Sequence, residues 1–353
     1  MNLGMPSITI RFIEKGASAI QRGQRGVVGL VLRGALPATN PVPVVTENDI
    51  VSTWSAANKQ FVKDTLKGYI QKPKKVLCFF VANDAEDYST ALDFFSSQYV
   101  DYVAFPTIAT DELESSVVSW VKNEWENHNP IIAVLPGVTG DFEGIVNFTT
   151  EDIKVGSNTY TPEQYTPRIA GLLAGTPMIM SATYATLNEV DDVARLTKEQ
   201  QDAAVAAGKL ILFFDAEKVR VGTAVTSFTT TTSEKGDSFK KIKLVDTMRQ
   251  ISRDIYSTVR DSYIGKYPNT YDNKVMLCNA IMGYFKQLTD IVENYSIDID
   301  AEQNATYLQS KGIDTSGMST EELRHANTGD KVFLIAKMNL VDVMENIDIP
   351  IYI

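Results

Sequence analysis

The sequence has few of the residues on which metal sites and disulfide frameworks depend. Among its 353 residues are two histidines and two cysteines. Cys78 and Cys278 each lie in an apolar stretch and are far apart in the chain, which favours two reduced thiols in the core over a disulfide. No Cys or His cluster has the spacing of zinc ligands, and His128 and His325 lie in polar sequence typical of a surface. We therefore expect no metal site and no catalytic histidine.

The glycines do not form a nucleotide-binding pattern either. Gly265-Lys266 lacks the upstream glycine of a P-loop. Gly23, Gly26 and Gly29 precede a predicted strand, whereas the dinucleotide fingerprint places its glycines after a strand so that the pyrophosphate meets a helix amino terminus. We expect no catalytic residues, no cofactor-binding residues and no cofactor.

Positive charge and long apolar runs are also scarce. The chain has 33 Lys and Arg against 44 Asp and Glu, a net charge of −11, and no dense basic stripe, which argues against nucleic acid as a partner. The longest uncharged stretch, Ile169–Asn188, is interrupted by Gly175 and Pro177 and predicts two short helices instead of a membrane span. The amino terminus lacks the basic and apolar regions of a signal peptide. We expect a protein that is made and folded in a cytoplasm and does not insert into a membrane.

At the amino terminus, residues 1–26 have the pattern of an extended arm. Ile8, Ile10 and Phe12 alternate with Thr9 and Arg11, which predicts one strand, and glycines follow it. Two interpretations are open: an edge strand of the first domain, or a strand donated to a neighbouring molecule.

Residues 27–208 predict an α/β outer domain, because short apolar runs alternate with helical segments. The expected strands are Val27–Leu32, Lys75–Val81, Tyr99–Phe105 and Ile131–Leu135, and the helices between them are Asp49–Ile70, Asp87–Gln98 and Thr110–Asn127. This order is typical of βαβ units and a largely parallel sheet. Further helices are expected at Pro162–Thr186 and Glu189–Ala207, with close helix packing at Gly171.

Residues 209–344 predict a separate α+β carboxyl-terminal domain. The β-branched run Val219–Thr232 and the alternating run Phe239–Val245 together favour a hairpin. Asp246 is expected to cap a helix with apolar residues every three or four positions, and a second helix is expected from Tyr271 to Val292. Ser319 to Glu322 has the form of a capping box before a short helix, and Lys331–Leu340 predicts a strand.

The last nine residues, 345–353, predict a second extended arm. Ile347, Ile349 and Ile351 alternate with Asp348 and polar or cyclic residues, which is the period of a strand. Pro350 cannot donate to a ladder and restricts the segment to an edge position. The predicted fold is therefore an α/β outer domain plus an α+β carboxyl-terminal domain, with extended N- and C-terminal β-arms.

Three stretches carry a resemblance to a known family. They are Val219–Thr232 with Phe239–Met248 and the two following helices, Arg168–Pro177 continued by Ser181–Tyr184, and Val341–Ile349. Taken in chain order and at this spacing, these stretches cover the chain from about Thr161 onward. Over this range it resembles the tail sheath proteins of contractile phage tails and phage-tail-like bacteriocins, especially those of Gram-positive bacteria.

The resemblance implies a structural subunit and no enzyme. Sheath subunits polymerise in stacked rings around an inner tube and contract to drive that tube through a target envelope, using energy stored in a metastable extended lattice. Baseplate and tail terminator proteins would be the other partners, and the assembled subunit would leave the bacterial cytoplasm in a phage or bacteriocin particle.

The resemblance also implies roles for particular residues. The two arms join small sheets on adjoining subunits by adding a strand, through Ile8, Ile10 and Phe12 at one end and Ile347, Ile349 and Ile351 at the other. The helix that begins at Tyr271 is expected to face the tube, with Lys274 and Lys286 as possible tube contacts. These lysines are as readily interpreted as simple solvated residues of that helix.

Two other classes of function remain open. The alternation of strands and helices is compatible with an α/β-fold enzyme or ligand-binding protein whose site is unrecognised. The inner-tube protein or another tail component is the second alternative, although tube proteins are usually much shorter and dominated by β-structure.

Overall fold

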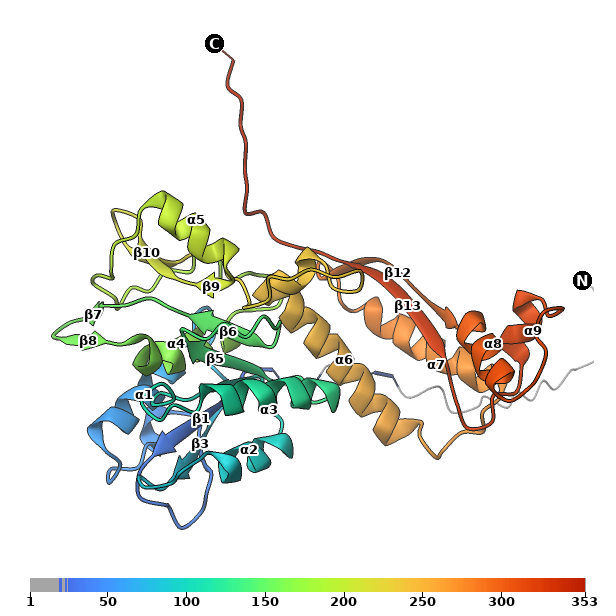
Figure 1. Ribbon diagram of the computed structural model, residues 1–353, viewed down its shortest axis with the longest axis horizontal. Coiled ribbons are helices and arrows are strands. Elements are labelled where there is room, and N and C mark those ends of the chain that lie inside the picture. The colour runs from blue at the N-terminus through green and yellow to red at the C-terminus, as the bar shows by residue number, and fades with distance from the viewer. Residues whose placement is uncertain (1–18, 21–22, 24, 353) are drawn as a thin grey trace, which may run out of the picture. The chain divides into compact units, whose positions relative to one another are not determined.

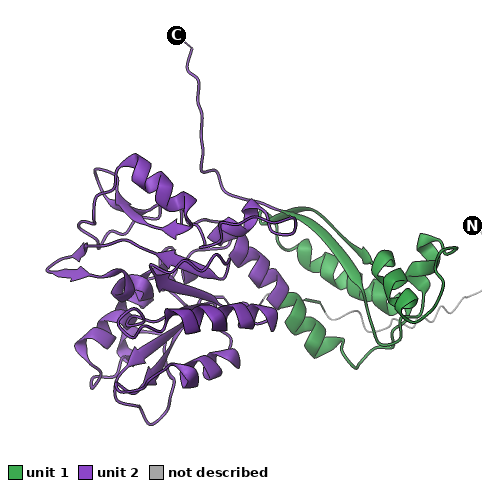
Figure 2. Ribbon diagram, viewed as in Figure 1, with its two compact units in different colours: residues 1–22, 254–339 green, residues 23–253, 340–353 purple. Residues whose placement is uncertain are grey.

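The computed structural model describes residues 19–20, 23 and 25–352. The chain divides into two compact units: unit 1, residues 1–22 and 254–339, and unit 2, residues 23–253 and 340–353 (Figure 2). This division falls at residue 253, whereas the sequence pattern placed the domain boundary between 208 and 209. Ile8, Ile10 and Phe12 lie outside the described residues.

Unit 2 is built on a mostly parallel sheet, which confirms the α/β prediction (Figure 1). Its strand order is β2-β3-β1-β4-β5-β6-β9. The strands are β1 (Val27–Arg33), β2 (Val42–Val44), β3 (Lys75–Val81), β4 (Tyr102–Ala104), β5 (Ile132–Pro136), β6 (Ile145–Phe148) and β9 (Lys209–Leu210). Edge strand β2 is antiparallel to β3, and the other pairs in this sheet are parallel.

Helices cover both faces of this sheet, which explains why its strands are continuous apolar runs. The helices are α1 (Ala56–Leu66) and α4 (Pro162–Ala174) over one face, and α2 (Ser89–Ser96) and α3 (Glu114–Glu126) over the other. Close packing of α1 on α4 requires Gly171, because a Cβ there would lie 2.1 Å from the carbonyl oxygen of Thr65. The predicted close packing at Gly171 is confirmed.

The remaining elements of unit 2 differ more from the prediction. They are the 3-10 turns η1 (Glu47–Asp49) and η2 (Asp237–Lys240), strands β7 (Ile153–Val155), β8 (Asn158–Tyr160), β10 (Leu212–Phe214) and β11 (Val219–Val221), and helices α5 (Lys198–Ala206) and α6 (Ile242–Ser262). The helices predicted at Pro162–Thr186 and Glu189–Ala207 are thus too long: they form over Pro162–Ala174 and Lys198–Ala206.

The predicted hairpin of Val219–Thr232 with Phe239–Val245 is wrong. β11 pairs with β10 instead, and the second run forms a single bridge, Val225 with Lys241, before α6 begins at Ile242. The alternation of Ile242 and Leu244 misled the prediction, because Ile242 and Val245 also have the spacing of one helix face and both are buried. Asp246 therefore lies inside the helix and is not its cap.

Unit 1 contains the end of α6 and the remaining elements. They are α7 (Tyr271–Phe285), β12 (Val292–Ile299), α8 (Ala301–Ser310), α9 (Thr320–His325) and β13 (Leu334–Leu340), whose last residue is counted with unit 2. β12 pairs with β13 in a small sheet. The second predicted helix is too long, because Phe285 ends α7 and Val292 begins a strand. The capping box at Ser319 is confirmed.

Candidate functional site: the terminal segments and their anchors

The carboxyl-terminal segment exposes apolar side chains to an unusual degree. Residues 341–352 form no helix, strand or turn, and the segment extends away from the rest of unit 2 (Figure 2). Ile347, Ile349 and Ile351 are 72%, 71% and 80% exposed. A contiguous apolar surface of this kind marks an interaction site, and its period-2 pattern suits pairing with another strand.

The root of this segment is held by the amino-terminal end of α6. Lys241 Nζ lies 2.5 Å from an Asp342 oxygen and 2.8 Å from a Glu345 oxygen, and Lys243 donates to the carbonyl oxygen of Val341. Thr183 Oγ1 donates to Glu345 at 2.7 Å. Burial opposes the charge on Lys241, but its bonds to the two carboxylates raise its pKa. The segment is therefore fixed up to Glu345 and exposed beyond it.

The root of the amino-terminal segment is held by the same helix. Arg25 donates through Nε to Asp246 Oδ2 at 3.0 Å and also to the carbonyl oxygen of Thr176. The backbone amides of Gly26 and Val27 donate to Asp101 Oδ2 at 2.6 and 2.8 Å. The chain is thus fixed in place directly before β1 begins.

A buried charge network joins these contacts to the parallel sheet. Arg249 lies 2.8 Å from Asp101 and 2.5 Å from Asp246, and Arg253 lies 2.6 Å from Asp101. The side chains of Asp101 and Arg249 are fully buried. Burial alone would raise the pKa of Asp246, but Arg25 and Arg249 lower it to about 2. Such a network holds its elements in one arrangement, because removing one partner leaves a buried charge uncompensated.

The sequence pattern did not reveal these anchors. Lys241 and Asp342 are brought together only by the fold. One signal was present: Asp246, Arg249 and Arg253 recur at helical spacing along α6, so they share a face that could have been recognised as a charged contact.

The two lysines expected to face the tube lie in different environments. Lys274 is 3% exposed, so its interpretation as a solvated residue of the helix is wrong. Lys274 is the fourth residue of α7, and its side chain faces the segment from Ala326 to Thr328, which contacts it there. Lys286, directly after α7, is exposed.

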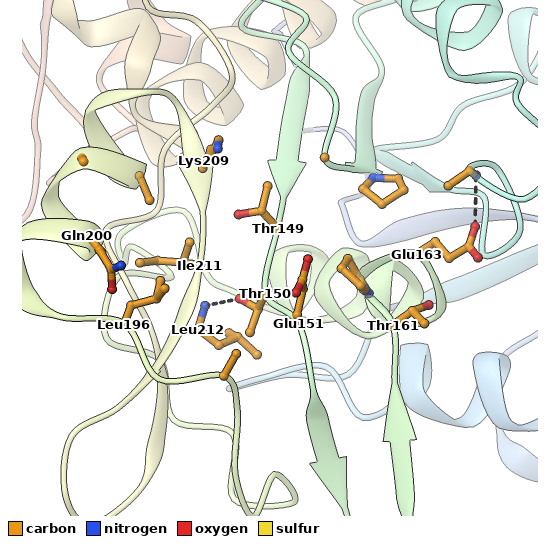
Figure 3. A pocket seen from close by; sticks show the side chains of 17 residues that line it. Thr149, Thr150, Glu151, Thr161, Glu163, Leu196, Gln200, Lys209, Ile211 and Leu212 are labelled. Atoms are coloured by element: carbon orange, nitrogen blue, oxygen red, sulfur yellow. Dashed lines mark hydrogen bonds between the residues drawn. The ribbon is translucent and has the colours of Figure 1, made fainter.

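A pocket of about 820 Å³ in unit 2 lies beside the carboxyl ends of β5 and β6 (Figure 3). Its side chains are mostly engaged in structure. The Glu163 carboxylate accepts from the amides of Ala109 and Thr110, and Thr150 Oγ1 accepts from the Leu212 amide at 2.6 Å. Among the described lining residues there is no histidine or cysteine.

The described residues contain neither of two further kinds of site. No group of three His, Cys, Asp or Glu side chains has a metal-binding arrangement there. Nor is any helix within the described ranges both long enough and apolar enough to span a membrane.

Comparison with known proteins gives consistent matches along the chain. Residues 82–227 match the model of the phage tail sheath protein central domain, and residues 234–353 match the phage tail sheath C-terminal domain. The tail sheath protein of Clostridium phage phiCD119 is 36% identical over 357 residues, covering 99% of both chains.

Solved structures with the same fold include two sheath proteins. The chain matches the Desulfitobacterium hafniense sheath tail protein with a TM-score of 0.70 and 16% identity, covering 84% of this chain and 94% of that one. It matches the anti-feeding prophage helical sheath in its contracted state with a TM-score of 0.71 and 15% identity over 99% of each chain.

Proposed function

The chain belongs to the phage tail sheath family, and from that premise we propose that its two terminal segments link neighbouring copies in a contractile sheath. It is a structural sheath subunit, like the phage relative that matches it over its full length. The observation that supports the proposed linkage is the contrast within the carboxyl-terminal segment, which is fixed as far as Glu345 and then exposes Ile347, Ile349 and Ile351.

The small sheet of unit 1 is the acceptor for these segments. In the part of the chain that the structure describes, β12 and β13 pair with each other and with no third strand. An edge strand with unpaired backbone groups is a template for another chain, and an added strand gains several main-chain hydrogen bonds. Ile8, Ile10 and Phe12 have the same alternation and are proposed as the amino-terminal donor.

Such a linkage suits a sheath that changes shape. Main-chain hydrogen bonds to a donated strand persist while the compact units move as rigid bodies. We assign to the assembled lattice the role of storing energy in an extended state and releasing it on contraction. The inner tube, the baseplate and the tail terminator are its proposed partners in a particle assembled in the bacterial cytoplasm.

We assign the contact with the inner tube to Lys286 instead of Lys274, because Lys286 is exposed and Lys274 is buried. An exposed ion pair contributes about 0–1 kcal/mol, so single contacts would be weak and their repetition along a tube would set the register. We also propose that the subunit has no catalytic activity, which is supported by the structural hydrogen bonds of Glu163 and Thr150 in the unit 2 pocket.

The linkage is tested by removing the segment beyond its anchor. Deletion of residues 346–353 leaves every contact of Glu345 in place, so we expect a folded protein that no longer forms long tubes in negative-stain electron microscopy. Replacement of Ile347, Ile349 and Ile351 by serine should have the same effect. Replacement of the three by valine, which keeps the apolar β-branched face, is the matched control and should still assemble. Long tubes from the deletion would refute the linkage.

A further inference from the structure

Unit 1 contains an apolar pocket with a buried ammonium group in its lining. The pocket has about 640 Å³. Its apolar wall is formed by Val259, Tyr263, Ile264, Tyr267, Leu277 and Val332. Lys274 reaches it from α7 and is 3% exposed.

Lys274 has no counter-ion among the residues that the structure describes. Its Nζ lies 3.3 Å from Thr328 Oγ1 and 3.5 Å from the carbonyl oxygen of Ala326, both neutral and both long for a charged donor. Burial lowers the pKa of Lys274. A buried ammonium is ordinarily paired with a carboxylate, so this side chain has the surroundings of an ion pair with one member missing.

A second polar atom of the same pocket is also unsatisfied. Asn269 Oδ1 is buried and has no hydrogen-bond partner among the described atoms, although the amide nitrogen of that side chain donates to Gly329 and Lys331. The pocket therefore combines apolar walls, a cation and a free acceptor. A ligand that matches it carries a carboxylate for Lys274, an N–H donor such as a backbone amide for Asn269 Oδ1, and apolar side chains beside them.

The carboxyl-terminal segment of the chain has this composition. Asp348 is exposed, forms no described ion pair, and lies between Ile347 and Ile349. It is the one acidic residue in the sequence from Asn346 to Ile353. We propose that the Lys274 pocket receives the Ile347–Ile351 segment of a second copy of this chain, with the Asp348 carboxylate paired to the Lys274 ammonium.

The position of the pocket supports a second copy as the donor. Its rim residues Gly329, Asp330 and Val332 directly precede β13, so a strand added along β13 passes the pocket at one end. In the same copy the chain continues from the other, carboxyl end of β13, at Leu340. This inference rests on the proposed strand linkage and adds to it the side-chain pair that sets the register.

The test measures binding of a labelled peptide with the sequence of residues 344–353 to the full-length protein, at concentrations where the protein is monomeric. Fluorescence anisotropy gives the dissociation constant. We expect the peptide to bind, and the Lys274→Met protein to bind it at least about tenfold more weakly, because it loses the charged hydrogen bond to Asp348. A peptide with Asp348→Asn should lose the same factor on the wild-type protein and nothing further on Lys274→Met.

Two more variants keep the result interpretable. Val332→Glu adds a carboxylate at the exposed pocket rim, which repels Asp348 of the peptide and competes for Lys274, and should also weaken binding. Lys286→Met, directly after the same helix, should not. Thermal unfolding of each variant checks the fold. Equal binding by wild type and Lys274→Met, with tubes still formed, would overturn the pocket assignment and leave the strand linkage standing. No binding by any variant and no tubes from the wild type would overturn both.

Discussion

At the level of single residues, Asp246 determines how the amino-terminal part of α6 is held. It accepts from Arg25 on one side and Arg249 on the other, and its pKa is lowered to about 2 from an ordinary 3.8. A carboxyl with a depressed pKa stabilises the fold above its unfolded-state value, and that contribution is lost as the pH falls towards 2.

Replacement of Asp246 by Asn should therefore reduce stability and change its pH dependence. We expect the free energy of unfolding at neutral pH to fall by about 3 kcal/mol, because Arg25 and Arg249 lose a buried partner. The wild type should lose stability between pH 3.8 and about 2, and the variant should lack that part of the loss. Urea unfolding at several pH values measures both effects. Asp237→Asn, at an exposed ion pair, is the control, and an unchanged pH profile in Asp246→Asn would contradict the assignment.

Residues of this kind were the hardest to interpret from sequence. Asp246 follows an apolar run and has the local signature of a helix cap, but its partner Arg25 is distant in the chain. Lys274 follows two polar residues, and its hydrogen bonds go to a distant segment, from Ala326 to Thr328. Burial of a charge depends on contacts between distant segments, and periodicity carries no information about those.

At the level of elements, a strand or helix was predicted correctly where its local sequence pattern is compatible with a single structure. β1 and β3 are apolar on both faces and were predicted within one residue of their bounds, because burial under helices on both sides requires that composition. The threonine-rich run after Val219 has strand propensity, but most of it pairs with no strand. Thr226 Oγ1, for example, donates to the carbonyl oxygen of Phe239 in the 3-10 turn η2. Propensity alone could not separate these outcomes.

Gly171 offers a direct test of packing between two elements. A Cβ at this position would overlap the carbonyl oxygen of Thr65 on α1, a backbone atom that moves only with its helix. We expect Gly171→Ala to lower the free energy of unfolding by about 1–3 kcal/mol through overpacking. Gly283→Ala is the matched control, because it lies within α7 with no atom near its Cβ position and should stabilise by up to about 1 kcal/mol through helix propensity. Thermal unfolding compares the two, and equal effects would contradict the packing argument.

At the level of the whole molecule, both terminal segments are rooted in unit 2 and on one stretch of chain. Lys241 and Lys243 hold the carboxyl-terminal root, and Asp246 holds Arg25 at the amino-terminal root. Residues 254–339 of unit 1 lie between these two roots in the sequence. We therefore expect a force that pulls on the two proposed arms to be carried by α6. The ion pairs of Arg249 and Arg253 with Asp101 would then transmit it to the parallel sheet. It need not pass through the small sheet of the same copy.

The carboxyl-terminal root provides the corresponding prediction. Replacement of Lys241 and Lys243 together by Met removes the bonds to Asp342, Glu345 and Val341 and keeps the aliphatic stems. The Lys241 pair is partly exposed and contributes about 1 kcal/mol or less to monomer stability. Lys243 is buried, and its charged hydrogen bond to Val341 adds about 1.5–3 kcal/mol, so thermal unfolding should show a monomer that is modestly destabilised and still folded. Assembled tubes should dissociate at lower urea concentration than wild-type tubes. The reason is that the segment that donates the strand is then no longer bonded to residues 241 and 243.

Sedimentation of tubes across a urea series measures this difference. Lys240→Met, which removes an exposed ion pair with Asp237 next to the anchor, should dissociate like the wild type. Added salt should weaken wild-type tubes towards the double variant, since ion pairs that are partly exposed are screened, and should have less effect on the double variant itself. If tubes of the double variant resist urea as well as wild-type tubes do, the contacts of Lys241 and Lys243 do not strengthen the assembly. The arms would then be held by their acceptor sheets alone.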